Sequence, residues 1–396
     1  MNIGTTDWAA WLDSYEGLPA RVLPSTGAPP VSNLHRLLAQ FAVIAPGLSM
    51  AGLLAVCAHY FADWTGRVLL GFESSPVGSI PVAIILGAVL RNTVDLPKQY
   101  EAGLKICVRF VLRLGIVLLG LRLSLPAVGT IGLAGLPIIA CSIVTALVVV
   151  ATLSKALGLS AKQGHLIAVG TGICGVTAIA ATASVIEADQ DEVSYAIACV
   201  TLFGTLAMFT YPSIAHGVFD GDNRLAGYLL GTSIHDTAQV TGAAMMYRQQ
   251  FHAPMALDVA TVTKLMRNTT MIFIIPVISF LVRRKEMHGR TKAIRISQAM
   301  PFFVIAYLIL SVVRGIGDLG TKAFILFDRS SWEVLLAQAD VSSGWLLAVA
   351  MAAVGLGTEF SRIRKLGWRP MVVGLTAAIM VGIVSLTSLK LFPPRF

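Results

Sequence analysis

The chain has 396 residues, of which 56% are hydrophobic and only 13% are charged, and its mean hydropathy is +0.76. Soluble domains are roughly 45–50% apolar and about a quarter charged, so this composition excludes an ordinary soluble globular protein. The net charge of +9 is interpreted as loop charge that sets membrane orientation, with an electrostatic field that favours anions as the alternative. A basic face for nucleic acid is not visible, so we expect no nucleic-acid partner.

The N-terminal segment differs from the rest of the chain. Residues 1–34 contain acidic residues before any strong apolar run, and three prolines close the segment. Because they lack the basic start and apolar core of a signal peptide, we predict a cytoplasmic tail. Residues 35–396 are predicted to form a single transmembrane domain, because their apolar segments follow one another with short loops.

Nine apolar segments have the length of a spanning helix, which needs about 20 residues. They are 37–61, 79–93, 104–124, 126–153, 193–216, 255–282, 298–315, 340–358 and 368–391. Two further segments, 161–187 and 222–247, are long enough but contain glycine and polar residues. The predicted fold class is therefore an all-α polytopic membrane protein with about nine spanning helices and two glycine-broken segments.

Basic residues predict the orientation, because loops rich in Lys and Arg stay in the cytoplasm. The loop at 283–295 carries six such residues and the loop at 362–369 carries four. The basic residues at 91–105 and 155–162 fall on the same side. The N-terminus is therefore expected in the cytoplasm and the C-terminus outside.

Parts of the sequence resemble one another. The matched pairs are 170–186 with 231–247, 195–214 with 258–278, 116–139 with 351–373, and 81–92 with 301–315. Internal duplication is common in secondary transporters. If each broken segment is a re-entrant hairpin, entering and leaving on one side, the repeats become inverted. We favour this arrangement over eleven full spans; crossing, unwound helices are the other way to build such a site.

Glycines interrupt both broken segments, and non-helical backbone at membrane depth must line a cavity or pack on protein. The residues expected to make the breaks are Gly170, Thr171, Gly172 and Gly175 in the first segment, and Gly227, Gly231, Thr232 and Ser233 in the second. Breaks expose helix N-termini, which attract anions, and helix C-terminal carbonyls, which hold cations. Close helix packing is the alternative role for such glycines.

Ionisable residues mark the second break and the helix after it. Intramembrane ionisable residues are costly and usually functional, and His235 with Asp236 could exchange a proton near neutral pH. A solvated pair at the membrane interface is the alternative. Lys264 and Arg267, at i and i+3, share one helix face. Three roles are open for them: neutralising an anion, pairing with Asp236, or extending to the interface.

The other charged residues and the cysteines are interpreted as structural. Arg109 and Arg113 are expected near the cytoplasmic end of their helix and Arg122 at the opposite interface. The acidic cluster Glu187, Asp189, Asp191 and Glu192 is expected in a solvated loop, with guarding an entrance as the alternative. The five cysteines have neither disulfide nor metal-ligand spacing. No ATP-binding or hydrolase motif occurs, so we expect no metal, cofactor or catalytic residue.

Four ordered motifs carry a family resemblance. They are RLGIVLLGLRLSL (113–125), GTGICGVTAIAATASVI (170–186), GTSIHDTAQVTGAA (231–244) and KLMRN (264–268). Together they resemble the YeiH-type family of proposed sulfate exporters, over nearly all of residues 37–390. The resemblance implies a bacterial inner-membrane secondary carrier, related to cation–proton antiporters and bile-acid symporters, with sulfate or a related oxyanion as substrate. His235-Asp236 stands where this family often has His-Glu, which keeps the carboxylate but shortens its reach.

The functional hypothesis is a secondary transporter of a small anion, with export as one option, working by movement of the broken-segment core against a scaffold of the remaining helices. The substrate-binding residues are expected to be Thr171, Gly172, Ile173, Cys174, Gly175, Thr177, Thr232, Ser233, Thr237, Gln239, Lys264 and Arg267. His235 and Asp236 are expected to couple transport to H⁺, with Na⁺ on the break carbonyls as the alternative. The partners are then the solute, the ion and the lipid bilayer, and a homodimer is allowed for.

Three other functions stay open. A cation/proton antiporter would use Asp236 as its ion-binding carboxylate. An intramembrane enzyme would use Cys174 as nucleophile or His235 as base. A passive channel is the third, although two matched breaks suit an occluded carrier better.

Overall fold

The computed structural model describes residues 33–69, 79–186, 188–271, 273–278, 302–319, 322–323, 327–359 and 367–394. Nearly all of the predicted cytoplasmic tail at 1–34 lies outside these residues. The basic loop at 283–295 and most of that at 362–369 also lie outside them, as does Glu187 of the acidic cluster.

Each of the nine predicted spanning segments contains a helix, although α12 ends at Thr269, well before the predicted end of the segment 255–282. These helices are α2 (Asn33–Trp64), α3 (Ser79–Thr93), α4 (Glu101–Ile106) continuing through η3 (Cys107–Val111) into α5 (Leu112–Leu119), α6 (Leu125–Ala156), α9 (Gln190–Val218), α12 (Pro254–Thr269), α15 (Phe302–Gly317), α16 (Arg329–Leu356) and α18 (Trp368–Leu391). Five of them, α2, α6, α9, α16 and α18, are long and apolar enough to cross a membrane, and α3 and α15 are shorter apolar helices.

Short elements join the long helices. They are η1 (Thr65–Leu69), η2 (Lys98–Tyr100), η4 (Gly120–Arg122) and a two-residue antiparallel ladder of β1 (Lys322–Ala323) with β2 (Phe327–Asp328). The ladder precedes α16 and does not alter the all-helical character of the described chain.

Large apolar side chains cover the outside of the bundle. Leu53, Leu133 and Phe273 are 66%, 65% and 73% exposed, on three different helices. A soluble protein rarely leaves extended apolar surface of this kind in water, whereas hydrocarbon is its favourable environment. The predicted class is confirmed: the chain is an all-α, multi-pass membrane protein.

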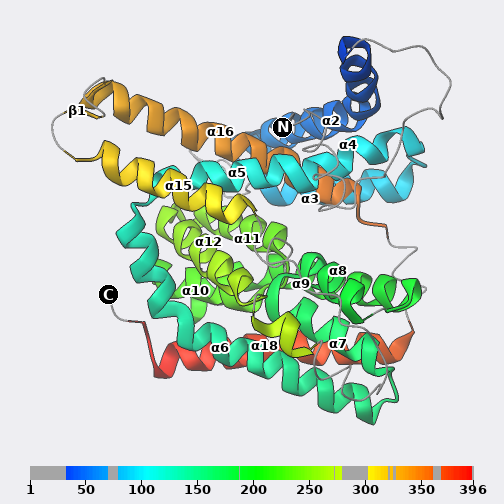
Figure 1. The fold of residues 1–396 in the computed structure, drawn as a ribbon. Coiled ribbons are helices and arrows are strands. Elements are labelled where there is room, and N and C mark those ends of the chain that lie inside the picture. The colour runs from blue at the N-terminus through cyan, green and yellow to red at the C-terminus, as the bar shows by residue number, and fades with distance from the viewer. Residues whose placement is uncertain are drawn as a thin grey trace, which may run out of the picture.

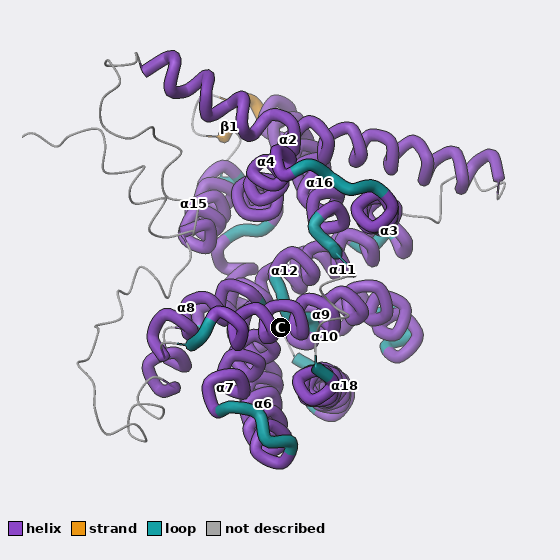
Figure 2. The backbone as a smooth tube through the Cα atoms, turned by 90° about the vertical axis from the view of Figure 1, so that its right-hand side faces the viewer, coloured by secondary structure: helices purple, strands orange, loops and turns teal. Residues whose placement is uncertain are grey.

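The helices form two layers, which lie one above the other in Figure 1 and in Figure 2. The scaffold layer contains α2, α3, α4, α5, α15 and α16, and the core layer contains α6 to α12 and α18. We expected every unbroken helix to belong to the scaffold. That expectation is wrong for four of them: α6, α9, α12 and α18 belong to the core layer and pack against the broken segments.

Both broken segments are hairpins. The first contains α7 (Ala161–Val169), η5 (Gly170–Cys174) and α8 (Val176–Ile186), and the second contains α10 (Asn223–Ser233) and α11 (Thr237–Phe251). Ser160, which precedes α7, hydrogen-bonds Glu192, which follows α8. Tyr247, near the end of α11, donates to Asn223 at the start of α10 over 3.4 Å. Each segment therefore begins and ends on one side, which confirms the predicted re-entrant geometry.

The two hairpins are related as inverted repeats. They enter from opposite ends of α9, because Glu192 lies at its start and His216, which contacts Tyr247, lies at its end. The helix contacts correspond in the same way: α6 contacts α7 and α12, and α18 contacts the matching helices of the other repeat, α10 and α9. A pseudo-twofold axis between the repeats requires such matching contacts.

Two glycines that we expected to break the second hairpin lie inside intact α10 instead. A Cβ on Gly227 would lie 2.7 Å from Val259 Cβ, and one on Gly231 would lie 2.7 Å from Thr263 Cβ. Because residues four apart share a helix face, both glycines bring α10 against α12. Their role is close packing, and the prediction of a break at these two positions is wrong.

The hairpin topology predicts which residues share a side of the membrane. Single cysteines placed at Ala161 and Asp191 should react with an impermeant thiol reagent from one side. Cysteines at Arg224 and Gln250 should react from the other side. Eleven full spans would instead place the two members of each pair on opposite sides, so that labelling pattern would contradict the hairpins.

Candidate functional site

The tips of the two hairpins meet in the middle of the core layer. Gly175 ends η5 with φ +67° and ψ −130°, which favours a residue without a Cβ. A Cβ at Gly175 would lie 2.6 Å from Asp236 Oδ2. The second hairpin is broken where Ile234 and Asp236 adopt extended backbone. The two hairpin tips and the two cations of α12 are together called the hairpin junction: Gly170–Gly175, Thr232–Thr237, Lys264 and Arg267.

Lys264 of α12 binds both hairpin tips. Its Nζ donates to the carbonyl of Ile173 over 2.9 Å and to that of Ile234 over 3.2 Å. It also donates to the carbonyl of His235. An ammonium group has three N–H donors, so these three carbonyls account for all of them.

Arg267 repeats this arrangement one turn further along α12. Its Nε donates to Gly172 O over 2.7 Å, and its Nη2 donates to Thr171 O. Its Nη1 donates to Thr232 O and Ile234 O over 2.6 and 3.0 Å. The guanidinium group thus joins the end of η5 to the end of α10.

These bonds satisfy the backbone where each hairpin stops being helical. The last carbonyls of a helix lack intrahelical partners and carry about half a negative charge, and unpaired carbonyls in hydrocarbon cost several kcal/mol each. Lys264 and Arg267 are 1% and 0% exposed, so the option that they extend to the interface is wrong. The carbonyls considered as Na⁺ ligands accept hydrogen bonds from these two cations instead.

Asp236 lies at the N-terminal ends of α8 and α11, the second helix of each hairpin. Its Oδ1 accepts from Ala238 N over 2.9 Å at the start of α11. The N–H of Val176, the first residue of α8, also donates to its carboxylate. A half-buried carboxylate therefore lies where two helix N-termini converge, which is the position at which we expected an anion.

Several buried polar atoms near the hairpin junction have no hydrogen-bond partner among the described residues. They are both ring nitrogens of His235, Thr171 Oγ1, Ser233 Oγ, Thr263 Oγ1 and Asn268 Oδ1. Buried polar groups are normally paired, so each exception calls for a water, an ion or a function. Thr263 and Asn268 were missed from the sequence, although the polar stretch TVTKLMRNTT in a predicted span was a usable signal.

Of the other residues predicted to bind substrate, most have hydrogen-bond partners within the protein and one is exposed. Gln239 Oε1 accepts from Asp236 N, and its Nε2 donates to Thr201 O on α9 over 3.0 Å. Thr232 Oγ1 donates to Tyr228 O within its own helix. The other contacts are Cys174 Sγ to Met271 Sδ at 3.1 Å and Asn268 Nδ2 to Thr237 Oγ1 at 3.2 Å. Thr177, just after the first break, is exposed.

A second charged cluster, the inter-layer bridge, contains Arg122, Arg248, Asp258 and Asp340. Arg122 Nε lies 2.6 Å from Asp258, and Arg122 Nη1 lies 2.6 Å from Asp340. Arg248 Nη2 lies 2.6 Å from the other oxygen of Asp340. Arg248 and Asp258 belong to α11 and α12 of the core layer, and Asp340 to α16 of the scaffold. Arg122, which we expected at the outer membrane interface, is ion-paired and links the two layers.

The other charged residues take structural positions. Arg113 of α5 stacks over the ring of Phe303 at 5.6 Å. Asp189 is the N-cap of α9, and its backbone N–H donates to Glu192 over 3.1 Å. The described part of the acidic cluster therefore begins a helix.

The fold and the hairpin junction define a class: multi-pass helical membrane proteins with two opposed re-entrant hairpins. The family model described as "Conserved hypothetical protein 698" matches residues 46–374. The chain belongs to this family.

Relatives from distant bacteria share most of the chain. A UPF0324 membrane protein of Bordetella pertussis is 30% identical over 332 residues, covering 83% of this chain and 89% of the relative. One from Streptococcus agalactiae is 30% identical and covers 86% and 96%. Another from Streptococcus pyogenes is 32% identical and covers 86% and 95%. The similarity spans both layers and both hairpins.

The backbone at Gly175 predicts a specific cost of adding a methyl group. Gly175→Ala should destabilise the protein by about 1–3 kcal/mol, because its Cβ meets Asp236 and its φ is positive. Gly129→Ala in α6, where a Cβ would meet nothing within 4 Å, is the matched control and should be neutral or stabilising. Thermal unfolding in detergent measures both; equal melting temperatures would contradict the tip geometry.

Proposed function

We propose that the protein is a secondary transporter of a small anion, bound at the hairpin junction beside the N-termini of α8 and α11. The observation that supports this most strongly is the charge of the junction. Two fully buried cations, Lys264 and Arg267, face one carboxylate, Asp236. Buried charges are expensive unless compensated, and an anion supplies the missing charge.

The helix dipoles do not remove this imbalance. Two helix C-termini contribute about −1 in total next to the cations, and two N-termini contribute about +1 next to Asp236. The side chains still leave one excess positive charge. A single-charged anion would neutralise the junction with Asp236 ionised, and a doubly charged one with Asp236 protonated.

This charge balance suggests how H⁺ could be coupled to the anion. Asp236 already occupies the position of an anion between two helix N-termini. A protonated Asp236 would release those N–H groups to the substrate, and the nearby His235, with both ring nitrogens unpaired, could take up a proton. Sulfate or a related oxyanion is the proposed substrate class, in line with the family resemblance of the four motifs.

The two layers suggest how access would alternate. In the proposed cycle, the core layer shifts against the scaffold layer and carries the junction from one side to the other. Positive-inside loops support a bacterial inner membrane with the N-terminus in the cytoplasm. The inter-layer bridge would lie at the outer end and would have to break during this movement.

Labelled sulfate counterflow in proteoliposomes tests the proposal. Wild-type protein should exchange sulfate, and a pH gradient should alter its net uptake. Asp236→Asn should remove the effect of the pH gradient, because the neutral side chain still caps α11 but cannot take up a proton. Asp189→Asn, at the N-cap of α9, is the matched control and should behave as wild type.

One result would overturn the proposal: absence of anion exchange from correctly folded protein, with sodium uptake tied to proton release, which would favour a cation/proton antiporter using Asp236. A different result, an unchanged pH effect in Asp236→Asn, would overturn only the coupling through this carboxylate.

The inter-layer bridge yields a separate prediction. Asp340→Asn should weaken two ion pairs, cost about 1–3 kcal/mol of stability and change the exchange rate, because the layers separate more easily. Glu359→Gln is the control, since Glu359 pairs with Arg91 inside the scaffold over 3.3 Å. It should lower the melting temperature without changing exchange per folded molecule. Equal effects on exchange would contradict a role for the bridge in layer movement.

A further inference from the structure

The two hairpins are matched in sequence but not in packing. Aligning 170–186 with 231–247 without gaps pairs Thr177, Ala180 and Ala181 of α8 with Ala238, Thr241 and Gly242 of α11. Ala238 and Thr241 are 4% and 2% exposed, whereas their counterparts Thr177 and Ala180 are exposed. The described protein therefore covers a face of α11 that it leaves open on α8.

The scaffold layer provides the cover on α11. A Cβ at Gly242 would lie 3.0 Å from Met351 Sδ of α16. Further along α11, Gln249 Nε2 donates to Ser79 Oγ at the start of α3 over 3.2 Å. The helix α8 packs instead on α7, η5 and α9, all within its own layer. The second hairpin is thus docked on the scaffold in a way that the first hairpin is not among the described residues.

The open face of α8 differs from the lipid-facing surface. Both views place α8, like α11, at the boundary between the layers (Figure 1, Figure 2). Among the described side chains of α8, no large apolar one is exposed, whereas other helices expose Leu53, Leu133 and Phe273. Arg113 of α5 in the scaffold interacts electrostatically with Asp236 at the hairpin junction. Small and polar side chains beside two charged groups suit water better than hydrocarbon.

We propose that the hairpin junction is open in this structure to the side on which α7 begins and α8 ends, along a water-filled path between α8 and α5. Thr177 and Ala180 line the core side of this path, and Arg113 lines its scaffold side. The path leads to Asp236, which is half-buried beside the N-terminus of α8. The basic residues at 155–162 lie at the same end, so this side is the predicted cytoplasmic one.

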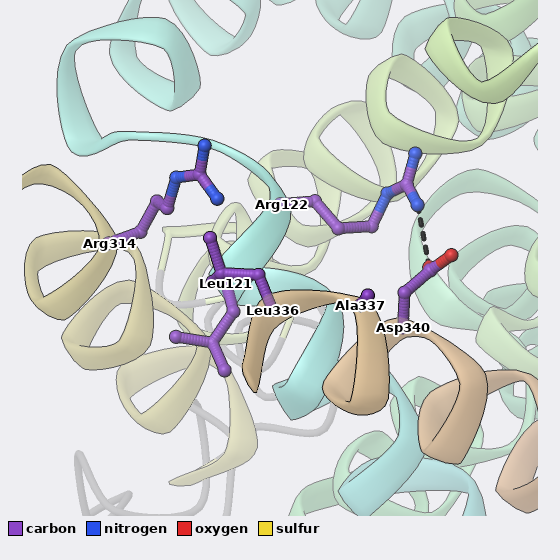
Figure 3. Close-up of a pocket in the computed structure, with 6 residues that line it drawn as sticks. All are labelled: Leu121, Arg122, Arg314, Leu336, Ala337 and Asp340. Atoms are coloured by element: carbon purple, nitrogen blue, oxygen red, sulfur yellow. Dashed lines mark hydrogen bonds and ion pairs between the residues drawn. The ribbon is translucent and has the colours of Figure 1, made fainter. Parts of the chain in front are cut away.

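The inter-layer bridge closes the opposite end. Arg248 of α11 and Asp340 of α16 join the core layer to the scaffold, with Nη2 and Oδ2 2.6 Å apart. Arg122 pairs with both Asp340 and Asp258, and Figure 3 shows its side chain directed toward Asp340. Ion pairs thus close one end of the layer boundary, while small exposed side chains leave the other end accessible.

The repeats also specify the packing in the opposite conformation, whose existence rests on the transport proposed above. In the paired segments that begin at Ile116 and Met351, these two residues correspond to each other. The contact of Gly242 with Met351 therefore has a counterpart between Ala181 and Ile116. When the outer end opens, α8 packs on α5 through these two residues and Thr177 becomes covered.

Thiol labelling tests the open path without requiring transport. Thr177→Cys and Ala180→Cys, each in otherwise cysteine-free full-length protein, are treated with an impermeant methanethiosulfonate in vesicles of known orientation. Ala238→Cys and Thr241→Cys are the matched controls on α11. The cysteines of α8 should react at least about tenfold faster than the controls, because the reactive thiolate forms in water and not in an apolar surrounding. They should react from the same side as Ala161→Cys.

Two results would overturn the path. One is equal labelling rates on α8 and α11. The other is labelling of Thr177→Cys only from the side on which Arg224→Cys reacts. Labelling of the path as expected in protein that exchanges no anion would support the path while the transport proposal fails, so the two failures are distinguishable.

A cross-link tests the packing predicted for the opposite conformation. Ala181→Cys and Ile116→Cys are joined by a short bifunctional reagent before Thr177→Cys is labelled. The cross-link should slow this labelling at least about tenfold, because α8 is then held against α5 and the thiol is buried. Cross-linking Gln249→Cys to Ser79→Cys is the control and should leave the labelling rate unchanged. Equal labelling rates after the two cross-links would contradict the predicted packing.

Discussion

Backbone carbonyls that end inside a membrane must find donors within the protein. Here η5 and α10, which end the first arm of each hairpin, stop in the middle of the core layer. Their last backbone carbonyls accept hydrogen bonds from side chains of the protein. Lys264 and Arg267, one turn apart on α12, donate to the carbonyls of both tips. The meeting of the two hairpin tips depends on this pair of buried cations.

The same interaction gives the protein its chemical character. Two cations stabilise the negative ends of η5 and α10, while Asp236 faces the positive ends of α8 and α11. Each helix end is thus matched by a charge of opposite sign, yet the sum of the side-chain charges is positive. This excess positive charge is the reason why anion transport is proposed ahead of cation/proton exchange.

The architecture was largely predictable, because hydrophobic length and repeat pairing depend on local sequence. The re-entrant geometry followed from the parity of the matched pairs, and the contact of Ser160 with Glu192 confirms it. The exact breaks were less predictable. Gly175 takes a positive φ, but Gly227 and Gly231 serve packing against α12, and glycine composition alone cannot separate these roles.

The partners of the charged residues could not be read from the sequence. Spacing placed Lys264 and Arg267 on one face, but whether that face meets carbonyls, a carboxylate or the interface depends on tertiary packing. Arg122 illustrates the same limit: its partners Asp258 and Asp340 are 136 and 218 residues away. Contacts over such separations are set by how the two layers meet.

The chain belongs to the family described as conserved hypothetical protein 698. The contacts of Lys264 and Arg267 with the hairpin tips can be expected in related bacterial membrane proteins that carry the same residues. The most direct test of anion binding at the hairpin junction is anomalous diffraction from crystals grown with selenate, a heavy analogue of sulfate. A selenium peak is expected beside Asp236 and Thr237, at the N-termini of α8 and α11. Ordered, fully occupied selenate elsewhere in a transport-active protein, with none at the hairpin junction, would contradict it.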